Sequence, residues 1–133
     1  MNTLAVDVEK KLGALKLAVR FEAAGGVTAL FGPSGSGKTS VVNMIAGLLT
    51  PDRGFIALNG TTLFDVAHRI NVPPHRRHIG YVFQEGRLFP HLSVRQNIDY
   101  GRRMSGHPRD AEESTRIVEL LGIGHLLDRR PRL

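Results

Sequence analysis

The feature that most constrains this chain is a glycine-rich run at positions 32–39, which reads GPSGSGKT. The run fits the pattern G-x-x-x-x-G-K-[ST], whose backbone N–H groups surround a row of phosphates. An apolar, β-prone run at 27–31 precedes it, and an unbroken helix-forming stretch at 38–47 follows it. Strand, loop and helix in this order are the context that the pattern requires. We therefore predict a buried strand, a phosphate loop and a helix that is buried nearly all round.

Each residue of the loop has an expected role in binding a polyphosphate. The glycines let the backbone turn its N–H groups inward, because a residue without Cβ adopts left-handed angles at low cost. The helix that follows points its free N–H groups and the positive end of its dipole toward the same anions. We expect Lys38 to place its ammonium against the β- and γ-phosphates and the Thr39 hydroxyl to bind Mg²⁺, which prefers hard oxygen ligands. The predicted phosphate contacts are Gly32, Ser34, Gly35, Ser36, Gly37, Lys38, Thr39 and Ser40.

Gln84 ends a second apolar run, at 78–83, which we also predict to be a short strand. Its amide oxygen is a candidate to contact Mg²⁺ or to orient an attacking water, as glutamine does in some phosphate hydrolases. A polar residue at a strand end is more often an ordinary loop residue, so this assignment depends on the phosphate loop upstream. Hydrolysis in this class also needs an acid at the end of an apolar strand, and Asp65, Asp99 and Asp128 have no full apolar strand before them.

The remaining sequence predicts an antiparallel sheet. Apolar and polar residues alternate at 4–8 and 15–21, as they do in half-buried strands. The dipeptide Asn59-Gly60 lies between two β-prone runs, at 54–58 and 61–64. It is the strongest short signal for a hairpin, because both turn positions need a positive φ.

Beyond the second apolar run the chain is predicted to be helical. Ser93 is suited to cap a helix that runs to about Met104. Pro108 fits the first turn of a further helix, and Gly122 is suited to close it. These helices follow the sheet in sequence, so the overall class is α/β with a helical C-terminal part.

Length and composition limit the alternatives. The chain has 133 residues, enough for one domain, and no cysteine, which excludes disulfides and thiolate metal sites. Its net charge of +6 is compatible with nucleic acid, an anionic membrane or phosphate ligands. The basic residues fall in short pairs such as Arg76-Arg77, which we interpret as solvated surface. No interleaving of aromatic and basic residues supports nucleic-acid binding.

Taken together, the stretches 32–40, 54–60 and 79–84 resemble the first half of the ATPase of ATP-binding cassette (ABC) transporters. The resemblance covers essentially the whole chain. It implies a P-loop NTPase-type nucleotide-binding domain, truncated, with a core and β subdomain at 1–92 and part of a helical subdomain at 93–133. It also implies that the loop binds ATP, that Lys38 and Gln84 serve catalysis, and that Thr39 and Gln84 bind Mg²⁺. Gln84 would couple the nucleotide to membrane subunits.

Within this family, the stretches 84–91 and 97–101 are most similar to the ATPases of molybdate importers, with sulfate, iron and sugar importers as alternatives. The resemblance implies that ATP hydrolysis powers uptake of the oxyanion. It implies membrane-spanning permease subunits and a second ATPase subunit as partners, and no nucleic acid. The expected location is peripheral, on the cytoplasmic face of the inner membrane.

The chain also departs from the family pattern. It has no Leu-Ser-Gly-Gly signature, no acidic pair at the end of an apolar strand and no switch histidine, and no aromatic residue lies at 10–12 to stack on adenine. We therefore expect an N-terminal fragment that binds nucleotide without turnover. A nucleotide-binding or subunit-interaction module without catalysis is the alternative. Because the strands at 27–31 and 78–83 would lack a neighbour, we also expect marginal stability or self-association.

Overall fold

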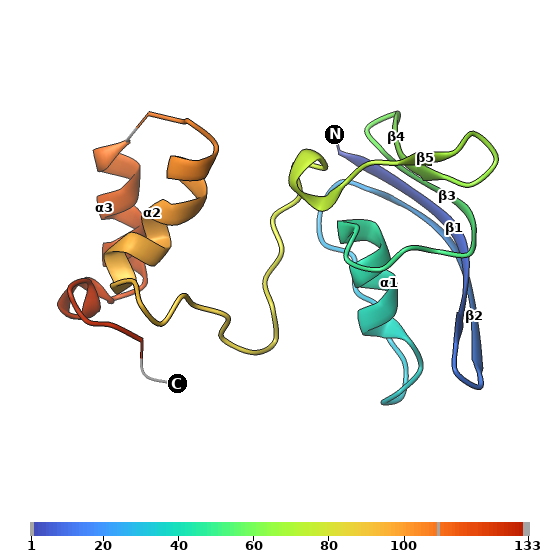
Figure 1. Cartoon of the computed structure of the whole chain (residues 1–133), viewed down its shortest axis with the longest axis horizontal. Coiled ribbons are helices and arrows are strands. Elements are labelled where there is room, and N and C mark those ends of the chain that lie inside the picture. Colours follow the sequence, from blue (N-terminus) through green and yellow to red (C-terminus); the bar gives the residue numbers. More distant parts are fainter. Residues whose placement is uncertain (1, 109, 132–133) are drawn as a thin grey trace. The chain divides into compact units, whose positions relative to one another are not determined.

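The computed structural model describes residues 2–108 and 110–131, and it divides into two units, Met1–Tyr81 and Val82–Leu133 (Figure 1). The first unit holds an antiparallel sheet, one α-helix and a short 3-10 helix, η1 (Pro74–Arg76). The second holds two α-helices and a short 3-10 helix, η2 (Gly124–Leu126). No helix within the described residues is both long and apolar enough to cross a bilayer.

The sheet of the first unit has the strand order β2-β1-β3-β4-β5, and every neighbouring pair is antiparallel. The strands expected at 4–8, 15–21, 54–58 and 61–64 are confirmed and extend beyond their predicted bounds. The turn between the third and fourth strands is also as predicted, because Asn59 and Gly60 have φ angles of 52° and 77°. The strands are β1 (Thr3–Leu12), β2 (Leu15–Ala24), β3 (Arg53–Leu58), β4 (Thr61–Asp65) and β5 (Ile70–Asn71).

Helix α1 (Lys38–Ala46) lies against one face of this sheet and closes the hydrophobic core (Figure 1). The bounds of the helix agree with the prediction, but the prediction that it is buried nearly all round was wrong. One face, with Val41 and Met44, is buried, whereas Val42 on another face is 41% exposed. A single sheet covers one side of a helix and leaves the opposite side open. The core consists of Val6, Val8, Leu17, Val41, Met44, Ile56, Leu63 and Phe64.

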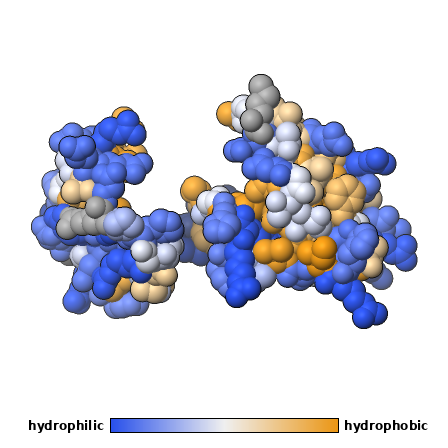
Figure 2. All heavy atoms as spheres, turned by 90° about the horizontal axis from the view of Figure 1, so that it is seen from above, coloured by the Kyte–Doolittle hydropathy of each residue, from blue (hydrophilic) through white to orange (hydrophobic). Residues whose placement is uncertain are grey.

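The two apolar runs predicted as strands, at 27–31 and 78–83, are not strands in the described chain. Val27 and Phe31 are 100% and 99% exposed, and Val82 is 95% exposed. A β-strand is stable only when its backbone groups pair with a neighbouring strand, and no described strand pairs with either run. Apolar side chains are accordingly open to solvent within a mainly hydrophilic surface (Figure 2).

The second unit contains α2 (Val94–Met104) and α3 (Ala111–Leu120). The Ser93 cap is confirmed, and Gln96 completes a capping box with it. The predicted start of the next helix at Pro108 was wrong, because the carboxylate of Asp110 accepts the N–H of Glu113 and sets the first turn there.

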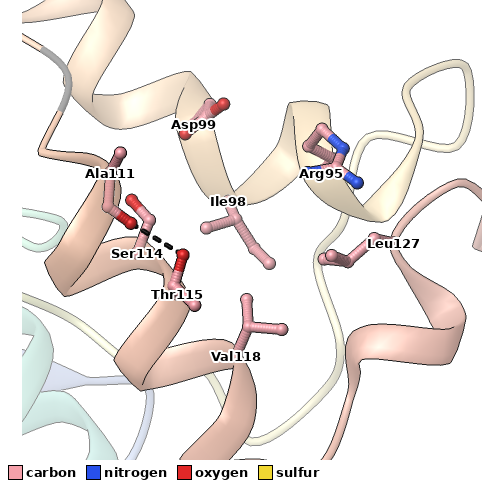
Figure 3. Close-up of a pocket in the computed structure, with 8 residues that line it drawn as sticks. All are labelled: Arg95, Ile98, Asp99, Ala111, Ser114, Thr115, Val118 and Leu127. Carbon is pink, nitrogen blue, oxygen red and sulfur yellow. Dashed lines mark hydrogen bonds between the residues drawn. The ribbon is translucent and has the colours of Figure 1, made fainter.

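A pocket of about 160 Å³ lies among α2, α3 and the chain after η2 (Figure 3). One wall of it is a turn of α3, in which the Thr115 hydroxyl donates to the Ala111 carbonyl at 2.8 Å. The pocket contains none of the residues predicted to bind phosphate or Mg²⁺. Its lining residues are Arg95, Ile98, Asp99, Ala111, Ser114, Thr115, Val118 and Leu127.

Asp52 joins β1 to the chain that enters β3. Its carboxylate accepts the Lys10 ammonium and the Lys11 N–H, each at 2.8 Å, and its own N–H donates to the Glu9 carbonyl. The hydrogen bonds from Lys10 and from the Lys11 backbone hold the pKa of Asp52 below its ordinary value.

This shift predicts how stability depends on pH. A depressed carboxyl pKa stabilises the fold above the unfolded pKa of about 3.9, and the stabilisation is lost as the pH falls through the folded pKa. Asp52→Asn removes the titrating group, so the free energy of unfolding should decrease less steeply below about pH 4 than in the unaltered chain. Urea titrations across this range measure the slope, and Lys10→Met should flatten it as well. An unchanged slope in both variants would contradict the assignment.

Candidate phosphate-binding site

The loop from Gly32 to Thr39 has the backbone geometry of a tight turn that leads directly into a helix. Gly35 and Gly37 adopt left-handed φ angles of 79° and 95°, and Gly37 is the N-cap of α1. Inside the loop, the Ser36 N–H donates to the Pro33 carbonyl at 3.2 Å. The loop is therefore ordered by its own hydrogen bonds and by two glycine positions that other residues adopt only with strain.

Two of the glycines also allow close packing. A Cβ atom at Gly32 would lie 2.8 Å from the Ser36 hydroxyl oxygen. At Gly37 it would lie 3.0 Å from a methyl group of Leu17, a core residue on β2. The sheet therefore packs closely against the loop, through Leu17, at the point where the helix begins.

The N-terminus of α1 has no side-chain cap, because its cap residue is a glycine. By contrast, Ser93 caps α2 and Asp110 caps α3 with side-chain oxygens. The first N–H groups of any α-helix have no partner within the helix, so those of α1 are available to an external acceptor. Together with the positive end of the helix dipole, they make this end of α1 suitable for an anion.

The Lys38 ammonium lies at this loop. Its Nζ donates to the carbonyl oxygens of Gly32 and Pro33 at 2.6 and 2.7 Å, and a longer contact of 3.4 Å joins it to the Ser36 hydroxyl. An ammonium has three donors, so these oxygens hold it in place. The loop thus places a cation and several N–H groups on one short segment, as a polyphosphate requires.

The other predicted site residues are on the surface or near it. Ser34 and Thr39 are exposed and Ser40 is half-buried, all within the same loop and first helical turn. Gln84 belongs to the second unit, where it is exposed in irregular chain, next to the contact of Arg87 with the Phe83 ring. The structure therefore brings the loop residues together in the first unit and leaves Gln84 in the second.

Each of the three candidate acids contacts a basic side chain. Asp65 accepts the N–H groups of Ala67 and His68 and contacts the His68 ring at 2.7 Å, and the His68 contact is the main cause that lowers its pKa. Asp99 pairs with Arg102, and Asp128 pairs with Arg95. Within the described residues, no three or more histidine, aspartate or glutamate side chains gather as a metal site would require.

Sequence reasoning missed one residue at the other end of α1. Arg77 is buried, 3% exposed, although its pair with Arg76 was interpreted as solvated surface. Its guanidinium donates to carbonyl oxygens at the end of α1. No local signal identifies this contact, because these two carbonyl oxygens lie more than 30 positions away in the sequence.

Comparison with known proteins agrees with this geometry. A sequence model of the ABC transporter family matches residues 17–133, which include the loop, most of the sheet, α1 and the whole of the second unit. The chain therefore belongs to the ABC transporter family, with a truncated P-loop ATPase fold of mixed α and β structure.

Within the ABC transporter family, the chain is similar to molybdenum import ATP-binding proteins. The chain is 58% identical over 128 residues to the molybdenum import ATP-binding protein ModC of Rhizobium meliloti. The aligned region covers 96% of this chain and 36% of that protein. It is 54% identical to the protein of the same name from Rhodospirillum rubrum and 52% identical to that from Paramagnetospirillum magneticum, with 96% of this chain and 35% of each relative covered. The chain thus spans about a third of the length of the curated relatives that it matches.

The close packing at Gly37 gives a test of the loop. Gly37→Ala combines a left-handed φ with a Cβ only 3.0 Å from Leu17, whereas Gly35→Ala has the left-handed φ and no atom within 4 Å. Gly35→Ala should cost about 1–2 kcal/mol of unfolding free energy through its backbone alone. Gly37→Ala should cost more, about 2–4 kcal/mol, because the core must also shift. Urea denaturation followed by circular dichroism measures both, and equal losses would show that Leu17 does not restrict the loop.

Proposed function

We propose that this chain supplies ATP binding in the ATPase subunit of a molybdate importer. The observation that carries the proposal is the loop at 32–39, which combines a tight glycine turn, an uncapped helix start and the Lys38 ammonium. The relatives support the substrate class, because three of them at 52–58% identity are molybdenum import ATP-binding proteins. Importers of sulfate, iron or sugars are the alternatives within the same family.

In this proposal Lys38 exchanges acceptors when ATP binds. Its present acceptors are neutral carbonyl oxygens of Gly32 and Pro33, whereas phosphate oxygens carry full negative charge. Hydrogen bonds between ionised partners are shorter and stronger than those to neutral oxygens, so the exchange is favourable. The residues assigned to the phosphates are Gly32, Ser34, Gly35, Ser36, Gly37, Lys38, Thr39 and Ser40.

Thr39 and Gln84 are the residues that we assign to Mg²⁺. The Thr39 hydroxyl is exposed in the first turn of α1, directly after Lys38, and is a hard oxygen donor of the kind that Mg²⁺ prefers. Mg²⁺ keeps several waters and takes few protein ligands when phosphates are present, so one hydroxyl and one amide oxygen fit its needs. When bound, Mg²⁺ would neutralise charge on the β- and γ-phosphates.

The wider assignment follows the family. ATP hydrolysis would power uptake, and Lys38 would stabilise the transferred phosphate. Gln84 would couple the nucleotide to membrane-spanning permease subunits. A second ATPase subunit would be the other partner, and the location would be peripheral, at the cytoplasmic face of the inner membrane. We assign residues 1–92 to a nucleotide-binding core and β subdomain, and residues 93–133 to part of a helical subdomain. For this chain we expect nucleotide binding without turnover, because no strand among the described residues ends in an acidic pair.

Removal of the ammonium tests nucleotide binding. Lys38→Ala should weaken MgATP binding by roughly 10- to 150-fold, since a hydrogen bond to a charged group contributes about 1.5–3 kcal/mol. Isothermal titration calorimetry measures the dissociation constant. Arg20→Ala is the matched control, because it removes one positive charge from a side chain that is 85% exposed on β2. If both variants bind as the unaltered chain does, the loop is not a nucleotide site.

Exchange of segments tests the transported ion. The segment of the Rhizobium meliloti protein that matches this chain is replaced by the corresponding 128 residues of this chain. Cells that carry the chimera should retain molybdate uptake, because the chain should fit the molybdate permease. The same segment taken from a sugar importer ATPase is the control and should support less uptake. A chimera that assembles and binds ATP, yet supports no more uptake than the control, would contradict the molybdate assignment.

A further inference from the structure

The C-terminal end of α1 is held by a buried guanidinium. Arg77 Nη1 donates to the carbonyl oxygens of Met44 and Ile45 at 2.9 and 2.8 Å. Its Nε donates to the Val72 carbonyl at 2.7 Å, and its Nη2 to the Asn71 amide oxygen at 3.1 Å. Two of these hydrogen bonds reach the last turn of the helix, and the other two reach the end of β5 and the residue after it. Arg77 therefore joins α1 to this part of the chain.

All four acceptors of Arg77 are neutral, and none is a carboxylate. The charge is instead placed at the negative end of the α1 dipole, where a cation is favourable. Burial lowers the pKa of the Arg77 guanidinium, but an arginine remains charged at neutral pH. Only a planar fork of donors reaches helix carbonyls and the neighbouring chain at once, so lysine is not an equivalent residue here.

Gly47 shows how closely the guanidinium approaches the helix end. It closes α1 with a φ of 83°, and a Cβ there would lie 2.6 Å from Arg77 Nε. A side chain at 47 would therefore displace the guanidinium. The glycine is required both by its backbone angle and by this contact.

A second bond joins the same segment to the middle of α1. The Tyr81 hydroxyl donates to the Asn43 side-chain oxygen at 2.6 Å, and the contact is partly buried. Residues 77–81 are therefore attached to the helix at two points, at the carbonyl oxygens of Met44 and Ile45 and at the side chain of the preceding residue, Asn43. Gln84 follows this segment after two further residues.

We propose that Arg77 and Tyr81 are positioning residues, which attach the segment leading to Gln84 to the helix that begins at the phosphate loop. α1 has the anion site at one end and this attachment at the other, so a displacement of the helix by a bound polyphosphate moves residues 77–81 with it. The proposal rests on the proposed nucleotide site, because it names how binding at Lys38 reaches the chain around Gln84. A continuous set of packed and hydrogen-bonded groups is the physical requirement for such a connection.

A single introduced tryptophan provides the test. The chain has no tryptophan, and Val82 next to Tyr81 is 95% exposed, so Val82→Trp adds one fluorophore beside the attachment without disturbing the core. We expect MgATP to change its fluorescence. In Val82→Trp chains that also carry Tyr81→Phe or Arg77→Lys, that change should lose most of its amplitude, while the dissociation constant for MgATP stays within about threefold.

Matched controls separate positioning from general damage. Tyr100→Phe is the control for Tyr81→Phe, because it makes the same chemical change in the second unit. Arg76→Lys is the control for Arg77→Lys, because it makes the same change at the exposed neighbour of Arg77. Both controls should keep the full fluorescence response. Circular dichroism and urea unfolding show whether each variant is folded, and Tyr81→Phe, which removes one oxygen atom, serves where Arg77→Lys does not fold.

Each result has one meaning. If MgATP does not bind to the Val82→Trp chain in equilibrium dialysis, the proposed nucleotide site is wrong. If MgATP binds and the fluorescence does not change, or changes equally in the folded Tyr81→Phe variant, the positioning role is overturned and the nucleotide site stands. Loss of the response in both attachment variants, with binding and folding retained, supports the proposal.

Discussion

The packing of α1 against the antiparallel sheet is the contact on which the first unit depends. A nine-residue helix is too short to persist alone in water, where roughly 12–15 residues are already marginal. Met44 and Ile56, both fully buried, hold it to the sheet. Because the helix begins at the phosphate loop, the same contact decides where the N–H groups of the loop point. Core packing and ligand geometry are therefore one constraint in this protein.

Local signals in the sequence predicted much of this structure. The alternation in β1 and β2, the positive φ angles at Asn59-Gly60 and the Ser93 cap each depend on residues within a few positions of one another. The loop at 32–39 was found in the same way, because its glycines, lysine and threonine are adjacent. Where the deciding interaction is between near neighbours in the chain, sequence reasoning is sufficient.

Two of the errors, over 27–31 and at Arg77, have the opposite cause. The run at 27–31 has the composition of a buried strand, but a strand also needs a hydrogen-bonded neighbour, and composition does not supply one. Arg77 looked like half of a solvated pair, and its burial depends on carbonyls of a helix far away in sequence. A third error is local, because the helix expected from Pro108 begins at Ala111 with Asp110 as its N-cap, and two plausible starts compete within a few residues. Pairing partners and buried polar contacts were thus the information that the sequence lacked.

The position of the Lys38 side chain has a thermodynamic consequence. Two main-chain oxygens solvate its charge within the turn, so an anion that binds there replaces these acceptors rather than meeting a bare cation. The measured affinity will report the difference between these two sets of oxygens. Any change that weakens the resident contacts without touching the ligand, such as a slight widening of the turn, would then tighten binding.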